Sequence, residues 1–266
     1  MNWFDIGVNL TNSRFAEDLE AVLQRAQQNG VSDMLITGTS ENESREALAL
    51  AERFQQFSTA GVHPHDADSV STDFVQQLHE LASHPRVLAI GECGLDFNRN
   101  YSAKSSQLRV FEQQLELAAE LQLPVFLHER DAFAQQLVLL KRYRNSLAGG
   151  VAHCFTGNRE QMEGYLELDL HIGITGWLCD PKRGKDLREA ITSLPLNRLL
   201  LETDAPFLFP KTLRPKSSRN EPASLPHIAS VLCDLRDLPL EQIAQMSTEN
   251  AQALFNISTD TEHGRT

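Results

Sequence analysis

Residues 87–92 read VLAIGE, an apolar run that ends in a carboxylate, and three later stretches of the chain have the same form. Each run is short and rich in branched apolar residues, which predicts a buried β-strand. The side chains that end the four runs are all of metal-ligating types: Glu92, His128 after PVFL, His153 after GVA, and Asp204 after LLLET. A parallel barrel gathers the carboxyl ends of its strands at one mouth, where its chemistry takes place. The pattern therefore predicts a barrel hydrolase with a metal ion at that mouth.

Strand-like and helix-like segments alternate along the whole chain. Eight such alternations imply a parallel sheet, and eight strands close a TIM-type (β/α)8 barrel of the α/β class. An open doubly wound sheet is the alternative, but residues 5–10, DIGVNL, lack the glycine-rich dinucleotide turn expected there. The predicted strands are 3–8, 34–37, 58–62, 87–92, 125–128, 151–153, 170–174 and 199–202. The predicted helices are 15–28, 41–55, 72–82, 104–121, 132–144, 159–166, 185–194, 225–235 and 240–254.

A single catalytic barrel domain is predicted over residues 1–258, followed by a polar, frayed tail at 259–266. Between the last strand and the final helices, residues 206–226 contain five prolines. We expect a long ordered loop there, placed at the barrel mouth.

Composition limits the classes of partner. The chain has 266 residues and a formal net charge of -12, which speaks against a simple electrostatic nucleic-acid binder. A phosphate substrate remains open, because bound divalent cations supply positive charge locally. The four cysteines form no CxxC pair. The chain has no apolar stretch of membrane-spanning length, and its first predicted strand leaves no room for a signal peptide. We expect a cytoplasmic monomer without a membrane partner.

Each ligand candidate also has a structural interpretation. Glu92 lies between glycines and suits a hard divalent cation, but it is also a possible capping residue. His128 and His153 can each ligate a metal or serve as a hydrogen-bonded rim histidine. Asp204 can bind metal, take a proton from water, or form a turn before a proline. Glu202 shares a strand face with Asp204, so one of these two carboxylates is expected to support the site from behind a ligand.

Three further residues near the predicted mouth are candidates for holding substrate phosphate: His63, His65 and Arg130. Each of the two histidines could contact phosphate or a metal, and Pro64 between them also suits a simple turn. A guanidinium fork such as that of Arg130 matches phosphate geometry. Trp177 and Phe155 are candidates for stacking a nucleobase, with core packing as the alternative for both.

Motifs along nearly the entire chain resemble the TatD family of metal-dependent deoxyribonucleases, within the amidohydrolase-like barrels. The matching segments are GVHPH at 61–65, GECGLD at 91–96, PVFLHER at 124–130, HCFTG at 153–157, ETDAP at 202–206 and RNEP at 219–222. The resemblance implies ligands at Glu92, His128, His153 and Asp204. It also implies 3′-to-5′ exonuclease cleavage of single-stranded DNA, with RNA as a second substrate, in DNA degradation or repair.

One departure from the family pattern concerns the first strand. Many members carry an HxH pair there, whereas this chain has Gly7 and Asn9, so two nitrogen ligands are lost. The subgroup to which TatD itself belongs shares this DIGVNL run, as the resemblance implies. The remaining site is expected to hold one or two Mg²⁺ ions, which prefer oxygen ligands, with Zn²⁺ and Mn²⁺ as alternatives.

The predicted mechanism assigns Glu92 and Asp204 to catalysis. Metal would activate a water toward the scissile phosphodiester, and Asp204 would orient or deprotonate that water. Two other functions stay open from the sequence. One is a barrel metallohydrolase acting on a small ester, amide or lactone, because the fold hosts many chemistries. The other is a non-catalytic binding protein whose metal site has degenerated.

Overall fold

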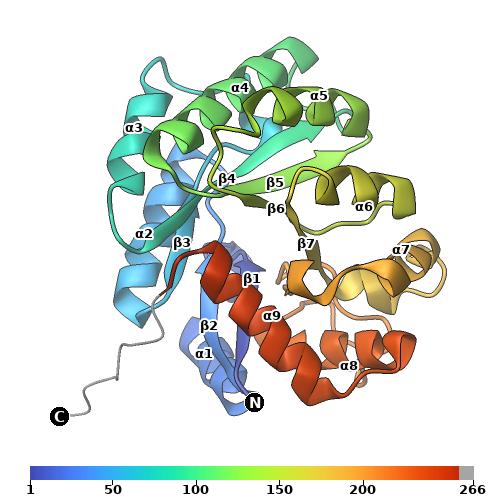
Figure 1. The fold of residues 1–266 in the computed structure, drawn as a ribbon. Coiled ribbons are helices and arrows are strands. Elements are labelled where there is room, and N and C mark those ends of the chain that lie inside the picture. The colour runs from blue at the N-terminus through green and yellow to red at the C-terminus, as the bar shows by residue number, and fades with distance from the viewer. Residues whose placement is uncertain (258–266) are drawn as a thin grey trace.

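Eight parallel strands form one sheet in the computed structural model, which describes residues 1–257. Each strand pairs with the next in chain order, and a parallel bridge between Val8 and Ala205 joins the last strand region to the first. The predicted (β/α)8 barrel is confirmed (Figure 1). Its strands are β1 (Trp3–Val8), β2 (Val31–Ile36), β3 (Phe57–Ala60), β4 (Val87–Asp96), β5 (Val125–Arg130), β6 (Gly150–Ala152), β7 (His171–Ile174) and β8 (Leu199–Leu201).

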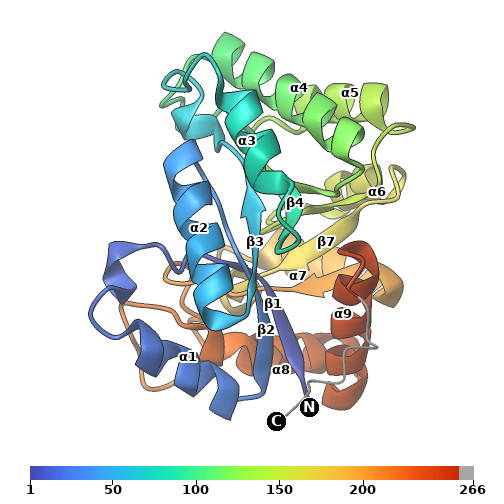
Figure 2. The same cartoon turned by 90° about the vertical axis from the view of Figure 1, so that its left-hand side faces the viewer.

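Helices surround the strands. Figure 2 shows α1, α2 and α3 along the outer face near the first strands, where α2 packs on β3 and α3 on β4. The helices are α1 (Leu19–Gln28), α2 (Glu41–Phe54), α3 (Phe74–Ala82), α4 (Lys104–Leu121), α5 (Phe133–Tyr143), α6 (Arg159–Leu166), α7 (Lys185–Ala190), α8 (Leu225–Arg236) and α9 (Leu240–Leu254). Short 3-10 helices lie at Ser13–Phe15, Pro64–Asp66, Gly176–Cys179, Ile191–Ser193, Leu196–Arg198 and Pro222–Ser224. None of the described helices is both long and apolar enough to cross a membrane.

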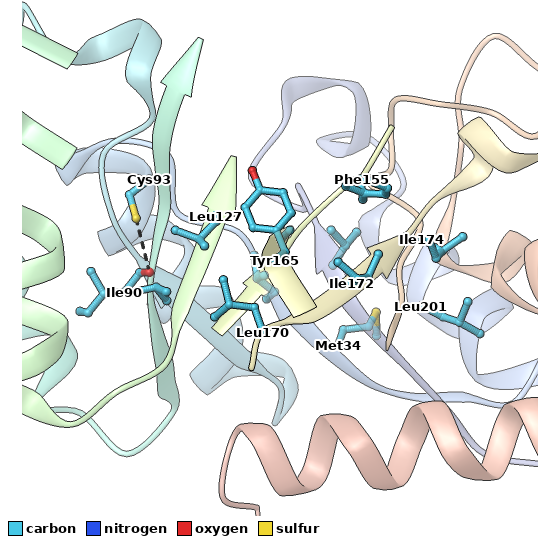
Figure 3. Close-up of a cluster of buried hydrophobic side chains, with 14 of the residues drawn as sticks. Met34, Ile90, Cys93, Leu127, Phe155, Tyr165, Leu170, Ile172, Ile174 and Leu201 are labelled. Atoms are coloured by element: carbon cyan, nitrogen blue, oxygen red, sulfur yellow. Dashed lines mark hydrogen bonds between the residues drawn. The ribbon is translucent and has the colours of Figure 1, made fainter. Parts of the chain in front are cut away.

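Two apolar layers hold the barrel together. The inner layer fills the barrel with buried side chains such as Phe4, Ile6, Phe126 and Leu200, and Phe255 follows α9 to pack against Phe4 at a ring distance of 6.1 Å. Ala251 of α9 also belongs to this inner layer, and Phe4 is near the start of β1, so the C-terminal end of α9 lies at the end of the barrel opposite the mouth. The outer layer lies between strands and helices, and Figure 3 shows part of it, with Tyr165 of α6 among apolar side chains of β5 and β7.

Several boundaries differ from the sequence prediction by a few residues; the strand predicted over 34–37, for example, is β2 and begins at Val31. The helix predicted over 15–28 is a 3-10 turn at Ser13–Phe15 followed by α1, because Asn12 caps the turn and Phe15 is buried. The helix predicted over 185–194 changes to a 3-10 turn after Ala190. The strand predicted to end at Glu92 continues to Asp96. The single-domain prediction reaches residue 258, and the predicted tail at 259–266 lies outside the described residues.

The proline-rich segment after β8 is tied to the start of the chain. Arg219 donates to both carboxylate oxygens of Asp18, at 2.6 and 2.8 Å, and to Glu221 at 2.7 Å. Arg25 contacts the same two acidic groups, and Arg14 donates to the carbonyl oxygens of residues 206 and 218. The segment is thus an ordered loop at the mouth, as predicted.

Candidate active site

All seven predicted site residues line one cavity of about 650 Å³ at the carboxyl ends of the strands. A volume of this order is typical of a small-molecule or cofactor site. The predicted residues in its wall are His63, His65, Glu92, His128, Arg130, His153 and Asp204. The barrel topology thus brings together side chains that are up to 141 positions apart in the sequence, from 63 to 204.

Within the cavity, the histidines gather around the Oε1 atom of Glu92. Three imidazole nitrogens surround this oxygen: His128 Nδ1 at 2.9 Å, His153 Nε2 at 3.0 Å and His63 Nε2 at 3.4 Å. Glu92, His63 and His128 each offer a ligand atom within 4.8 Å of the other two. The sequence allowed His63 to contact either phosphate or a metal, and the structure places it among the candidate metal ligands.

The protonation states follow from burial and charge. Burial disfavours the carboxylate of Glu92, but the charge of His153 and hydrogen bonds from the histidines outweigh it and hold the pKa of Glu92 well below its usual value. Burial likewise disfavours charge on His153, yet Glu202 and Glu92 on either side raise its pKa well above normal. Burial lowers the pKa of His63 to about 4, so this imidazole is neutral and able to ligate a cation.

Glu202 lies behind His153 and is fully buried. Its Oε2 atom contacts His153 Nδ1 at 2.9 Å, and its Oε1 atom accepts a hydrogen bond from the backbone N–H of Cys154. This pairing fixes the ring so that Nε2 faces Glu92, an arrangement typical of metal-binding histidines. The sequence predicted that one of Glu202 and Asp204 supports the site from behind a ligand, and in the structure Glu202 has this position.

Two glycines make room for that carboxylate. A Cβ atom at Gly7 would lie 2.2 Å from Glu202 Oε2, and one at Gly173 would lie 2.3 Å from Oε1. Any side chain at either position collides with Glu202. Gly7 therefore provides space on β1 at a position where many family members carry a histidine.

Asp96 is a buried part of the site that the sequence analysis did not assign. It faces His65 Nε2 at 2.7 Å and lies 3.7 Å from His128 Nε2, a buried nitrogen with no hydrogen-bond partner among the described residues. A signal was present in the sequence, since Asp96 is four residues after Glu92 and shares its strand face. The prediction that the strand ends at Glu92 concealed it.

Asp204 stands on the turn after β8, in a left-handed conformation with φ 52°. Asn9 Nδ2 donates to its Oδ1 atom at 2.9 Å, and its own N–H donates to the carbonyl oxygen of Gly7. Burial raises the pKa of Asp204 to about 7, against the opposing charge of His153. A carboxylate with a pKa near neutrality is suited to accept a proton from water.

A second buried carboxyl group fixes the backbone of that turn. Asp5 of β1 accepts hydrogen bonds from the N–H groups of Thr203 and Gly7, at 2.8 and 3.3 Å, and also contacts the Thr203 hydroxyl. Burial raises the pKa of Asp5 to about 8, so the group is largely protonated at neutral pH. Asp5 thus fixes the residue before Asp204, and Asn9 holds the Asp204 carboxylate. The sequence had suggested neither role.

The cavity wall also carries cations and an indole. Arg130 lies at the end of β5, with its guanidinium 5.8 Å from the Trp177 ring, and Arg183 stacks on the same ring at 4.5 Å. Trp177 is half buried in the cavity wall, whereas Phe155 is buried in the outer core and contacts Tyr165. Of the two aromatic candidates for base stacking, Phe155 is thus committed to packing.

These donors fit a divalent cation. Three imidazole nitrogens lie around one carboxylate oxygen of Glu92. The second nitrogen of His128 has no hydrogen-bond partner among the described residues, and Glu202 supports His153 from behind. This is the usual organisation of a protein metal site. It contains more nitrogen than the carboxylate-weighted site expected from the sequence.

Comparison with known proteins places the chain in a family. The family model for TatD-related DNases matches residues 4–256. The chain belongs to the TatD-related DNase family. A protein of *Pectobacterium parmentieri* named 3′-5′ ssDNA/RNA exonuclease TatD is 50% identical over 259 residues, covering 96% of this chain and 100% of that protein. A protein of the same name from *Salmonella typhimurium* is 51% identical over 257 residues, covering 96% and 99%.

Solved structures agree with this TatD-family assignment. The TatD homologue YJJV from *Escherichia coli* superposes with a TM-score of 0.89 at 34% identity, over 96% of this chain and 98% of that chain. An organophosphorus hydrolase mutant from *Deinococcus radiodurans* superposes with a TM-score of 0.62 at 14% identity, over 95% and 92%. The second likeness concerns the barrel fold alone.

Proposed function

We propose that this TatD-family chain is a divalent-metal-dependent nuclease that removes nucleotides from the 3′ end of single-stranded DNA, and of RNA. The observation that carries the proposal is the convergence of three imidazole nitrogens on one carboxylate oxygen of Glu92, at the mouth of a DNase-family barrel. The names of relatives that are about half identical support the substrate and the polarity.

In this proposal the cation is held by Glu92, His128 and His153, with His63 as a further ligand suggested by the geometry. When bound, it would supply Lewis acidity toward a phosphodiester oxygen and lower the pKa of a water. Mg²⁺ is the ion proposed from the sequence. The imidazole nitrogens make the same place open to Mn²⁺ and Zn²⁺.

The chain's own residues supply proton transfer and positioning. Asp204, which was also proposed as a ligand, orients the attacking water and accepts its proton; Asn9 holds this carboxylate in place. Glu202 keeps His153 in the orientation that points Nε2 into the site. Arg130 and His65 are positioned in the cavity wall to hold phosphate oxygens, so that charge developing on the phosphate is met by fixed donors.

The test is cleavage of a 5′-labelled single-stranded oligonucleotide by protein that has been stripped of metal and supplied with Mg²⁺, Mn²⁺ or Zn²⁺ in turn. We expect a ladder of products shortened from the 3′ end. Glu92→Gln and Asp204→Asn are expected to lose at least about 100-fold in turnover, because each removes a group essential to the proposed water activation. Glu20→Gln, on the outer surface beside Arg53, serves as the control.

Undiminished cleavage by both site variants would contradict the proposal, as would faster turnover of a p-nitrophenyl ester or lactone than of the oligonucleotide. The second result would favour a small-molecule metallohydrolase. Metal analysis of the purified protein identifies the resident ion.

We further propose that the protein works as a monomer in the reducing cytoplasm, in DNA degradation or repair. Its four cysteines are all unpaired, which is compatible with a reducing compartment. Light scattering in solution checks the oligomeric state.

A further inference from the structure

Two exposed aromatic rings flank the mouth of the barrel. Among residues 1–257, four large apolar side chains are exposed: Met1, Tyr101, Val138 and Phe207, with Tyr101 at 64% and Phe207 at 46%. Of these four, only Tyr101 and Phe207 are aromatic, and both lie in loops that follow the carboxyl ends of strands. Exposure of a single ring is ordinary, but these two border the cavity, Phe207 as part of its wall and Tyr101 through His65, so both can contact what the cavity binds.

Tyr101 lies in the loop between β4 and α4. Its ring meets the imidazole of His65 edge to face, with centroids 4.7 Å apart and planes at 71°. The guanidinium of Arg99 donates to its hydroxyl at 3.2 Å. The guanidinium of Arg99 also lies over the ring, 6.0 Å from its centroid, and most of the side chain stays open to solvent.

Phe207 lies in the loop after β8, three residues beyond Asp204. Its N–H donates to the carbonyl oxygen of Asp204 at 2.9 Å, and its side chain lines the cavity. The carbonyl of the preceding residue accepts hydrogen bonds from Arg14 at 3.1 Å and from the backbone of Asn220 at 3.0 Å. The backbone that presents this ring is thus anchored at the peptide group that precedes it.

The two rings stand on opposite sides of the candidate catalytic centre. In a barrel with strand order β1 to β8, the ends of β4 and β8 lie across the mouth from each other. Glu92, on β4, and Asp204, after β8, lie in the cavity between the two loops. A strand whose phosphate is held at Glu92 would pass one ring on each side of that phosphate.

We propose that Tyr101 and Phe207 each stack an unpaired nucleobase, one on either side of the scissile phosphate, and that this pair of rings selects single strands. The inference rests on the proposed nuclease function and specifies how that site recognises its substrate. Every base has a π-face, so stacking binds any sequence, but a base inside a duplex has no free face to offer.

Charge supports this occupant. The whole chain has a net charge of -12, so long-range attraction to a polyanion is absent, and local groups must provide the affinity. Three arginines in the cavity wall suit the phosphates: Arg99, which donates to Tyr101, and Arg130 and Arg183 beside Trp177. Stacking supplies the part of the binding energy that does not depend on charge.

The experiment measures binding of a fluorescein-labelled hexathymidylate by anisotropy, with Mg²⁺, in the Asp204→Asn background so that turnover does not interfere. A matched oligonucleotide carries abasic residues at its two 3′-terminal positions. Base–aromatic stacking contributes about 1–3 kcal/mol per base, which corresponds to roughly 5- to 150-fold in Kd. We expect Tyr101→Ala and Phe207→Ala each to weaken binding of the thymidylate within that range.

The same substitutions are expected to leave binding of the abasic oligonucleotide unchanged. Tyr101→Phe and Phe207→Tyr should bind the thymidylate like the parent, since both keep the ring. Val138→Ala, on the outer helix α5, is the matched control for removal of an exposed apolar side chain. In the catalytically competent protein, the preference for single-stranded over blunt duplex DNA should fall when either ring is removed.

Three results would overturn the inference: equal Kd values for the thymidylate with and without the rings, equal losses on both oligonucleotides, or no measurable binding of either one. These outcomes are separable from failure of the proposed function. If the natural sequence binds the oligonucleotide through its bases but does not cleave it, the nuclease function is refuted and the stacking site stands. If it cleaves the oligonucleotide but binding does not depend on the rings, the stacking site is refuted and the nuclease function stands.

Discussion

Replacing Glu202 with Gln tests whether the buried carboxylate behind His153 organises the site. The natural side chain offers an acceptor oxygen to each of two neighbours, His153 Nδ1 at 2.9 Å and the N–H of Cys154. A glutamine has nearly the same shape but only one acceptor oxygen. One of the two neighbouring N–H groups must then face an NH₂ group in a fully buried position.

The magnitude follows from that mismatch. A buried donor left without an acceptor is destabilising by about 1–3 kcal/mol, and loss of a group that orients a metal-binding histidine typically reduces metal affinity or activity about 10- to 100-fold. We expect Glu202→Gln to lower both the free energy of unfolding and the Mg²⁺-dependent kcat/KM by these amounts. The surface variant Glu20→Gln should change neither.

Gly7→Ala moves the same carboxylate without changing its charge. The added Cβ atom would lie 2.2 Å from Glu202 Oε2 and 3.2 Å from the Phe126 ring, and Gly173 limits movement the other way. Overpacking of this kind is destabilising by about 1–3 kcal/mol, and His153 should lose its support as well. Metal titrations of turnover, with urea unfolding in parallel, measure both effects. If Glu202→Gln keeps the metal affinity and kcat/KM of the natural protein, the supporting role of Glu202 is refuted.

Three other predictions concern stability. The pKa of Asp5 is raised to about 8 in the fold, so its contribution to the free energy of unfolding is fully present at low pH and is lost as pH rises from about 4 through 8. Asp5→Asn should remove this pH dependence in urea unfolding. Asp5→Ala should destabilise the fold by about 1–3 kcal/mol, because it leaves the N–H of Thr203 unpaired. Adding the resident metal at about 100 times its Kd should raise the free energy of unfolding by about 2.7 kcal/mol, and Glu92→Gln should show no such gain in thermal melts. Arg219→Ala breaks the ionic contacts with Asp18 and should make residues 206–221 more sensitive to limited proteolysis with little change in global stability, because surface ion pairs contribute little. An unchanged digestion rate would count against these contacts as the anchor of the loop.

The barrel was predictable because each strand carries its own apolar signal. Short branched runs separated by helical periodicity identify eight βα units without any knowledge of contacts. The extension of β4 was not predictable in the same way. The apolar run stops at Glu92, which lies between Gly91 and Gly94, so the strand was predicted to end there. In the fold both glycines adopt positive φ angles, and pairing with β5 resumes after an irregularity at Gly91–Cys93 and continues to Asp96.

The candidate ligands were predictable because each ends an apolar run, and strand ends of a parallel barrel meet. Groups whose role depends on three-dimensional closure were not. Asp5 and Thr203 are 198 positions apart, and only the junction of β1 with β8 brings them together. The two rings at the mouth, Tyr101 and Phe207, lie in loops without periodicity, so no sequence pattern distinguishes them from ordinary surface residues.

The first strand shows how the loss of two ligand positions can alter a site without emptying it. From the sequence, Gly7 and Asn9 are only absences, since many family members carry histidines there. In the fold, the missing side chain at Gly7 creates the space that Glu202 occupies behind His153, and the amide of Asn9 holds Asp204 at 2.9 Å. A histidine at position 7 would displace Glu202 and weaken the support of a ligand that the site still has. Adding back both histidines therefore need not rebuild a second metal position. Asn9→His alone restores one nitrogen ligand and leaves Glu202 in place, so this variant separates the effect of a missing ligand from the effect of displacing Glu202.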